Sequence, residues 1–113
     1  MQLEERKYLF DIQRAADRIT RFCMNKQFQQ YRSDELLRSA VERQFEIIGE
    51  ALSHLARLNP EVTARIPEHR RIIAFRNILI HGYATVDDQI VWGVIENFLP
   101  ALHESVTAFL NDQ

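Results

Sequence analysis

The segment SDELLRSAVERQFEIIGEALSHLARL, residues 33–58, decides the class of fold. Its apolar residues recur every three or four positions, which is the spacing of one face of an α-helix. Ser33 is a favourable N-cap ahead of two acidic residues, and Asn59-Pro60 ends the pattern. We therefore expect a helix over residues 33–58 that buries one apolar stripe, formed by Leu37, Val41, Phe45, Ile48, Leu52 and Leu55.

The same helical spacing extends to both sides of this segment. It predicts further amphipathic helices near residues 3–24, 68–81 and 87–111, with a polar connection over 25–32. Pro100 interrupts the last helix but not its apolar stripe, so we expect that helix to be kinked or split there. Four such helices with short connections favour an all-α, up-and-down four-helix bundle, with residues 1–113 as a single domain.

Two glycines carry specific predictions. Gly49 lies inside the 33–58 helix, where glycine costs about 1 kcal/mol relative to alanine. We expect it to allow the close approach of another backbone. Gly82 follows the 68–81 helix, and we expect it to take the left-handed conformation that is common just past a helix end.

The composition excludes several classes of protein. Hydrophobic residues make up 46% and charged residues 27%, which is typical of a globular protein and not of a disordered one. Cys23 is the one cysteine, so it cannot form an intrachain disulfide, and a reducing compartment is favoured. No apolar run approaches the roughly 20 residues of a membrane helix. We expect a cytoplasmic protein without a membrane segment, and no cofactor or metal site, since the histidines lack ligand spacing.

The charge is uneven along the chain. The formal net charge is -2, and residues 1–64 are neutral overall. Residues 65–83 hold four arginines against one glutamate, whereas residues 84–113 hold five acids and no Lys or Arg. A single short basic segment favours a local phosphate-handling site over an extended nucleic-acid groove.

The basic segment contains the stretch RNILIHGY, residues 76–83. Residues four apart share a helix face, so Asn77 and His81 should lie together, with Arg76 beside them. Gly82 should leave His81 on the last turn and Tyr83 just outside the helix. This arrangement brings a cation, an amide, an imidazole and a phenol to one helix end.

These groups suit RNA cleavage without a metal. Histidine, with an ordinary pKa of about 6.5, can take a proton from the ribose 2′-OH or donate one to the leaving 5′-oxygen. The planar guanidinium of Arg76 can bind the charged oxygens of the transition state. Asn77 can donate to a phosphate oxygen or orient the imidazole.

The pattern Arg-x4-His-x-Tyr, with Asn directly after the Arg, resembles the signature of the HEPN superfamily and its HepT-like branch. Ile48-Gly49-Glu50-Ala51, Val86-Asp87 with Val91-Trp92, and Leu99-Pro100 also resemble that branch. The resemblance covers the chain from residue 33 onward, whereas the first helix matches only in pattern. One departure is Ile66-Pro67-Glu68-His69-Arg70, where the branch would have a Trp after the Pro.

The resemblance implies an activity and two partners. It implies a metal-independent endoribonuclease toxin with an RNA substrate and with Arg76, Asn77 and His81 as catalytic residues. It also implies a homodimer that brings two copies of the motif to one cleft. It further implies a partner nucleotidyltransferase that neutralises the toxin by transferring AMP to the motif tyrosine, here Tyr83.

Structural roles compete with each of these assignments. His81 could interact only with the helix dipole, Asn77 could be a surface residue, and Tyr83 could pack on the core. Glu50 is expected mainly to anchor Arg76 or Arg43. Arg70 and Arg71 could form a solvated face or could guide phosphate to the site. Trp92 is expected in the core or in a dimer interface. A non-catalytic helical module that binds a nucleotide or a protein, or a plain interaction bundle, is the alternative to the enzyme.

Overall fold

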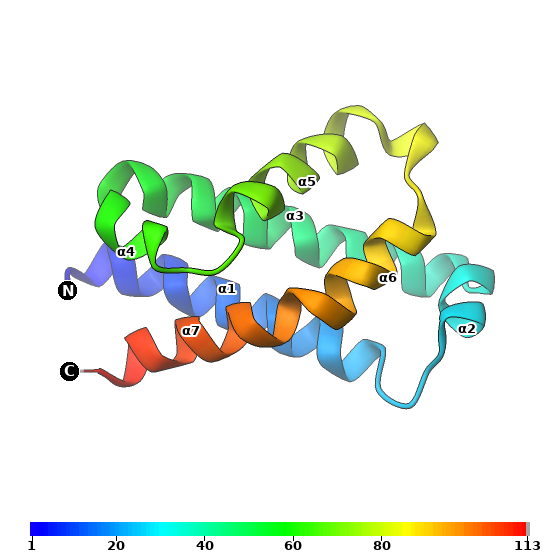
Figure 1. Cartoon of the computed structure of the whole chain (residues 1–113), viewed down its shortest axis with the longest axis horizontal. Helices are drawn as coiled ribbons and strands as arrows, with labels where there is room; N and C mark the ends of the chain where they lie inside the picture. The colour runs from blue at the N-terminus through cyan, green and yellow to red at the C-terminus, as the bar shows by residue number, and fades with distance from the viewer. Residues whose placement is uncertain (113) are drawn as a thin grey trace.

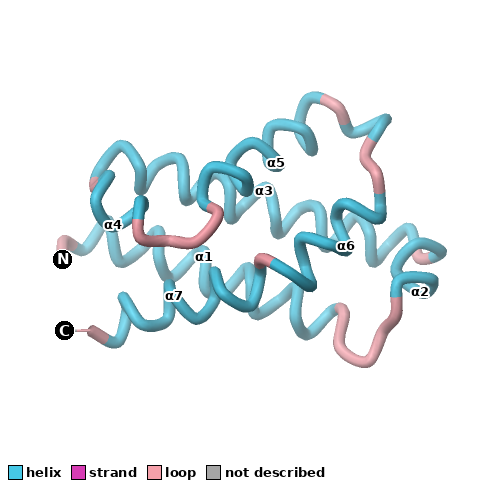
Figure 2. Tube along the Cα trace, in the orientation of Figure 1, coloured by secondary structure: helices cyan, strands magenta, loops and turns pink. Residues whose placement is uncertain are grey.

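The computed structural model describes residues 1–112, apart from the side chain of Tyr83, and these residues are helical along most of their length (Figure 1). No strand occurs among them (Figure 2). The α-helices, together with a short 3-10 helix η1, are α1 (Leu3–Phe22), α2 (Phe28–Ser33), α3 (Glu35–Leu58), α4 (Pro60–Ala64), α5 (His69–His81), η1 (Tyr83–Thr85), α6 (Asp88–Asn97) and α7 (Leu99–Asn111).

The longest helices, α1 and α3, form an antiparallel pair at the centre (Figure 1). Helix α5 packs on α3, and α7 packs on α1. The all-α class is therefore confirmed, and successive long helices alternate in direction (Figure 1). A regular four-helix bundle is not confirmed, because α2 and α4 add short helices and because α5 and α7 pack mainly on one long neighbour each.

The apolar stripes predicted from the sequence form the core. Val41, Phe45, Ile48, Leu52 and Leu55 of α3 are fully buried. They meet the stripe of α1, and the Phe45 ring lies edge-on to that of Phe75 in α5, with 5.3 Å between ring centroids. This aromatic pair fixes the middle of α5 against α3.

The start of α3 differs from the prediction. The connection predicted over residues 25–32 contains helix α2, which runs through Ser33. Ser33 is therefore not the N-cap of α3, and its hydroxyl instead donates to the Gln29 carbonyl at 2.7 Å. Asp34 is the cap, because its carboxylate accepts a 3.0 Å hydrogen bond from the Leu37 N–H.

The end of α5 also differs in detail. The helix stops at Gly82, as predicted, but Gly82 has φ -122°, so the left-handed conformation was a wrong prediction. The turn is closed by η1, in which the Thr85 N–H donates to the Gly82 carbonyl at 2.9 Å. The backbone therefore turns through a 3-10 helix and needs no positive φ.

The last predicted helix is split, as expected. Helix α6 ends at Asn97, and α7 begins at Leu99 with Pro100 in its first turn. A proline there costs little, because the N–H that it lacks would have no partner within the helix. Within the part of the chain that the structure describes, none of the helices combines the length and apolarity needed to cross a membrane.

Candidate functional site

The site begins with a close contact between α3 and α5. Gly49 is buried on α3, and a Cβ built there would lie 2.7 Å from Cγ of Arg76 and closer still to its Cβ. The missing side chain of Gly49 therefore makes room for the base of Arg76. A close approach occurs at Gly49, as predicted, but the group that approaches is the Arg76 side chain, whereas the prediction was a backbone.

Two hydrogen bonds orient the guanidinium of Arg76. Its Nη2 donates to the Glu50 carboxylate in an ion pair, and its Nη1 donates to Oδ1 of Asn77 at 3.0 Å. Its Nε is buried without a hydrogen-bond partner among the described residues, although 25% of the side chain stays exposed. Because a guanidinium has five N–H groups, donors remain for a further ligand. Of the two expected roles of Glu50, the structure shows pairing with Arg76, whereas Arg43 pairs with Glu46.

Glu50 also joins a chain of polar contacts that the sequence reasoning missed. Its Oε1 lies 3.0 Å from Nε2 of His54, and Nδ1 of His54 lies 2.7 Å from Nη2 of Arg57. The hydrogen bond from His54 and the charge of Arg76 lower the pKa of the Glu50 carboxyl below its ordinary value. The signal for His54 was present in the sequence, because it stands four residues after Glu50 on the same helix face.

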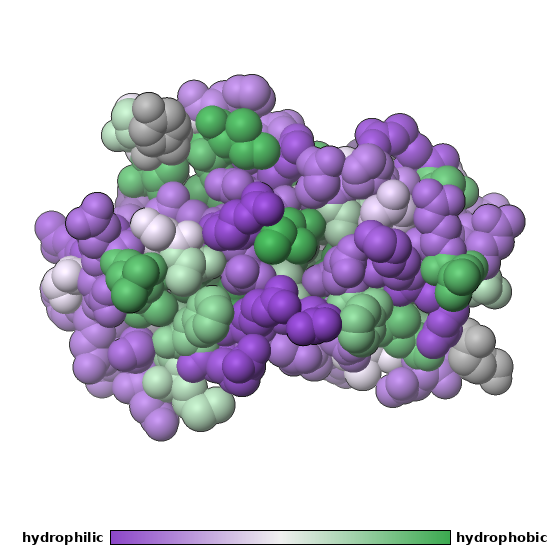
Figure 3. Space-filling view, turned by 180° about the vertical axis from the view of Figure 1, so that it is seen from behind, coloured by the Kyte–Doolittle hydropathy of each residue, from purple (hydrophilic) through white to green (hydrophobic). Residues whose placement is uncertain are grey.

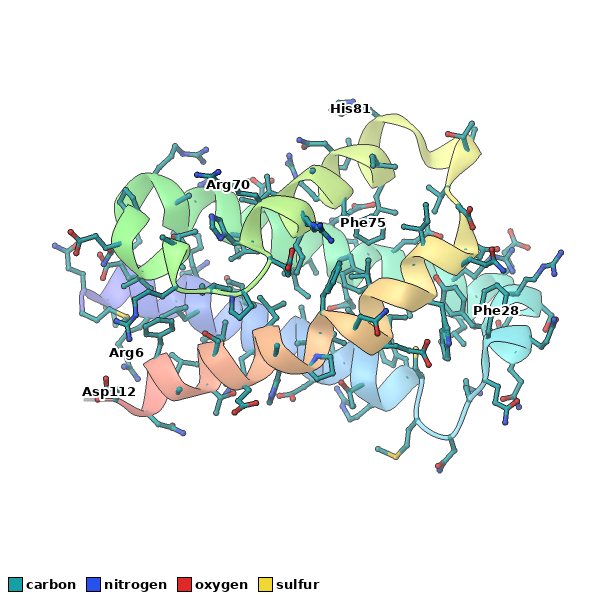
Figure 4. The ribbon with its side chains drawn as sticks, in the orientation of Figure 1. Arg6, Phe28, Arg70, Phe75, His81 and Asp112 are labelled. Atoms are coloured by element: carbon teal, nitrogen blue, oxygen red, sulfur yellow. The ribbon has the colours of Figure 1, made fainter. Side chains whose placement is uncertain are left out.

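Asn77 and His81 lie on the exposed face of α5. The side chain of His81 points away from the body of the protein at the C-terminal end of α5 (Figure 4). This side chain is exposed and makes no hydrogen bond within the part of the chain that the structure describes, which leaves out the Tyr83 side chain. The structure thus brings Arg76 and Asn77 into contact and leaves His81 one helical turn further along, accessible to solvent.

The backbone of Tyr83 begins η1, directly after α5. Its side chain lies outside the described residues. The predicted position just past the helix is therefore confirmed for the backbone alone.

Arg70 and Arg71 lie at the other end of α5 from His81 (Figure 4). At about 1.5 Å per residue, Arg70 stands roughly 16 Å from His81 along the helix axis. Arg71 pairs with Glu68 at 3.2 Å and covers the ring of Phe98, whereas Arg70 is exposed. The structure does not bring these two arginines to the Arg76 site, and their guidance of phosphate stays a prediction.

A groove of about 500 Å³ opens beside Arg76, between α1, α3 and α5. We call it the Arg76 groove; its walls include Lys7 and Tyr8 of α1, Arg43, Glu50 and His54 of α3, and Arg76 of α5. Among residues 1–112 no three His, Cys, Asp or Glu side chains are grouped so that they could hold a metal ion.

Comparison with known proteins identifies the family. Residues 12–109 match the family described as "Ribonuclease HepT-like". A protein of Thermococcus cleftensis named "Probable ribonuclease HepT" is 32% identical over 106 residues, which cover 90% of this chain and 92% of that protein. Proteins of Methanocaldococcus jannaschii and Caldanaerobacter subterraneus subsp. tengcongensis, whose names provisionally assign RNase activity, are 28% and 30% identical. These two alignments cover 88% and 96% of this chain, and 90% and 96% of those proteins.

No solved structure matches the chain significantly. The family match spans α3 and α5, the helices that carry Gly49, Glu50, Arg76 and His81. The chain therefore belongs to the HepT-like ribonuclease family of the HEPN superfamily.

Proposed function

We propose that the chain is a metal-independent endoribonuclease that cleaves RNA at the Arg76–His81 end of α5. The observation that carries the proposal is the orientation of Arg76 by Glu50 and Asn77, one turn from the accessible imidazole of His81. Membership of a ribonuclease family indicates the class of reaction, which is cleavage of RNA.

In the proposed mechanism the ribose 2′-oxygen attacks the adjacent phosphorus and the bond to the 5′-oxygen breaks. The products are a 2′,3′-cyclic phosphate and a 5′-hydroxyl. His81 transfers a proton to or from these oxygens, and Arg76 stabilises the charge on the non-bridging oxygens. Asn77 positions the phosphate or the imidazole, and Glu50 holds the guanidinium of Arg76 in place.

A homodimer would complete the site by bringing two Arg76–His81 pairs to one cleft. Apolar side chains of α5 support this arrangement, because Ile78 is 53% exposed and Ile80 is 38% exposed beside the motif. In the view from behind, apolar side chains gather at the edge where α5 ends (Figure 3). A symmetric dimer is the commonest way to cover such a face.

The proposal includes control by a cognate nucleotidyltransferase antitoxin that transfers AMP to Tyr83. The backbone of Tyr83 follows His81 within two residues, so an AMP group there would lie beside the motif. Its phosphate would compete with RNA for the same charged donors. Tyr83→Phe should then escape neutralisation, and the Tyr83 peptide of the wild type should gain AMP mass with the partner, ATP and magnesium. Inhibition without that mass gain would show that the partner acts by covering the cleft.

The cleavage proposal is tested with purified protein and labelled RNA in EDTA. His81→Ala should lower the rate by roughly 10²–10⁴-fold, which is the usual contribution of a general acid or base. Arg76→Lys should also be slow, since it keeps the charge and loses the planar fork. His103→Ala, at a histidine of α7 that pairs with Asp17, is the matched control and should cleave at the wild-type rate. Equal cleavage by all four proteins would place the chemistry away from Arg76 and His81, and no cleavage by any of them would favour a non-catalytic binding module.

A further inference from the structure

The Arg76 groove contains side chains that the proposed cleavage chemistry does not use. Its volume of about 500 Å³ lies within the range of sites that bind small molecules or single groups of larger ones. It shares Arg76 with the catalytic end of α5, so a ligand in the groove would lie next to the phosphate that Arg76 binds.

The charges around the groove are compensated in pairs. Lys7 pairs with Asp11 at 3.1 Å, Arg43 pairs with Glu46 at 3.3 Å, and Arg76 pairs with Glu50. All six of these side chains line the groove. Three cations balanced by three acids leave the groove without net charge, so beside the phosphate that Arg76 binds it favours an uncharged, polarisable group.

Two aromatic rings form one wall of the groove. The ring of Tyr8 stacks on the imidazole of His54, with centroids 5.1 Å apart and planes inclined by 11°, so this contact covers one face of each ring. Nζ of the exposed Lys7 side chain lies 5.2 Å from the centroid of the Tyr8 ring, and a base that packs on Tyr8 would displace it. The guanidinium of Arg57 can only donate, so it donates to Nδ1 of His54, and Nε2 therefore carries the proton and donates to Glu50. Because both ring nitrogens are engaged, His54 offers a ligand its ring and no free hydrogen-bonding group.

We propose that the Arg76 groove is a subsite for the nucleobase adjacent to the scissile phosphate, and that this base packs against the Tyr8–His54 ring pair. The inference rests on the proposed ribonuclease function and adds a place for the substrate base. Aromatic stacking accepts every base, because each has a π-face. The subsite therefore requires a base at this position and discriminates little among the four.

The test compares RNAs that carry an abasic nucleotide on either side of the mapped scissile bond. For the wild type, one of the two abasic RNAs should lose roughly 5- to 100-fold in kcat/KM, which corresponds to the usual loss of one stacked base. Tyr8→Ala should show a similar loss on intact RNA and no further loss on that abasic RNA. Tyr8→Phe keeps the ring and should recover most of the kcat/KM that Tyr8→Ala loses. Phe10→Ala is the control, because Phe10 is an exposed aromatic of α1 that does not line the groove.

Binding provides a readout that does not depend on cleavage. His81→Ala is combined with each Tyr8 variant, and the affinity for intact and abasic RNA is measured by fluorescence anisotropy. If no protein cleaves RNA, but intact RNA still binds more tightly than abasic RNA, the proposed function is overturned and the subsite stands. The subsite is overturned if the wild type shows the same kcat/KM and the same affinity for intact RNA and for both abasic RNAs. This comparison uses the wild type alone, so it does not depend on whether a variant folds. A Tyr8→Ala protein that sediments as a monomer where the wild type is a dimer would also overturn the subsite, because a second copy of the chain would then cover the groove.

Discussion

At the scale of single residues, the position of Arg76 depends on the absence of a side chain at Gly49. Helix α5 approaches α3 so closely at this point that the Arg76 side chain occupies the space of a Gly49 Cβ. The glycine lowers the helix propensity of α3, but the room it leaves lets the guanidinium of Arg76 reach Glu50, the next residue of the same helix. The position of Arg76 therefore depends on a residue 27 positions before it in the chain.

Gly49→Ala should displace α5 and lower the free energy of unfolding by about 1–3 kcal/mol, the usual cost of overpacking. Cleavage should fall with it, because Arg76 would no longer meet Glu50. Gly93→Ala is the matched control within α6, since a Cβ there would meet only Asn97 Nδ2, at 3.9 Å. It should raise the free energy of unfolding by about 0.5–1 kcal/mol, because alanine is the better helix former. Urea unfolding measures both changes, and an unchanged stability of Gly49→Ala would contradict the close packing.

At the scale of the helices, periodicity predicted the long elements and missed the short ones. The stripes of α1, α3, α5 and the α6–α7 pair could be predicted because burial repeats over several turns. Helix α2 was missed because its six residues contribute one fully buried side chain, Tyr31, which is too few for a period. The cap of α3 was then assigned one residue early, since both Ser33 and Asp34 are suitable capping residues.

The capping assignment gives a direct comparison of two neighbouring residues. Asp34→Ala should lower the free energy of unfolding by about 1 kcal/mol, because the Leu37 N–H loses its partner. Ser33→Ala should change it by less, since the Ser33 hydroxyl bonds only within the exposed helix α2. Thermal or urea unfolding of both variants shows which one loses more free energy of unfolding. A larger loss for Ser33→Ala would place the cap where the sequence pattern first put it.

In the candidate site, too, contacts between residues close in the sequence could be predicted, whereas a contact between helices that no motif marks could not. Arg76, Asn77, His81 and the supporting Glu50 could be found from the sequence, because one motif and one helix stretch carry them. The contact of His54 with Glu50 was also within reach of the sequence, because the two residues are four apart on α3. The stacking of Tyr8 on His54 was not, because it joins α1 to α3 and requires the tertiary packing. Arg70 and Arg71 lie near the motif in the sequence, but α5 holds them at its opposite end, and only the folded helix shows this separation.

At the scale of the whole molecule, we predict a homodimer formed over the α5 face. The wild type should sediment at twice the 13.4 kDa mass of one chain. Ile78→Asp should shift it toward the monomer and reduce cleavage, because it places a charge on an exposed apolar side chain beside the motif. Leu3→Asp is the control, since Leu3 is 84% exposed at the far end of the molecule from the end of α5 (Figure 1). A fully active wild-type monomer at micromolar concentration would contradict the shared cleft.

The central claim is that the Arg76–His81 end of α5 cleaves RNA through the ribose 2′-oxygen. The most direct measurement incubates the purified protein, in EDTA, with two RNAs that differ by a single 2′-deoxyribose at the scissile position, and analyses the new ends by mass spectrometry. The account predicts a 2′,3′-cyclic phosphate and a 5′-hydroxyl from the all-ribose RNA, and an intact phosphodiester in the 2′-deoxy RNA. Equal cleavage of both RNAs, or cleavage that EDTA abolishes, would contradict it.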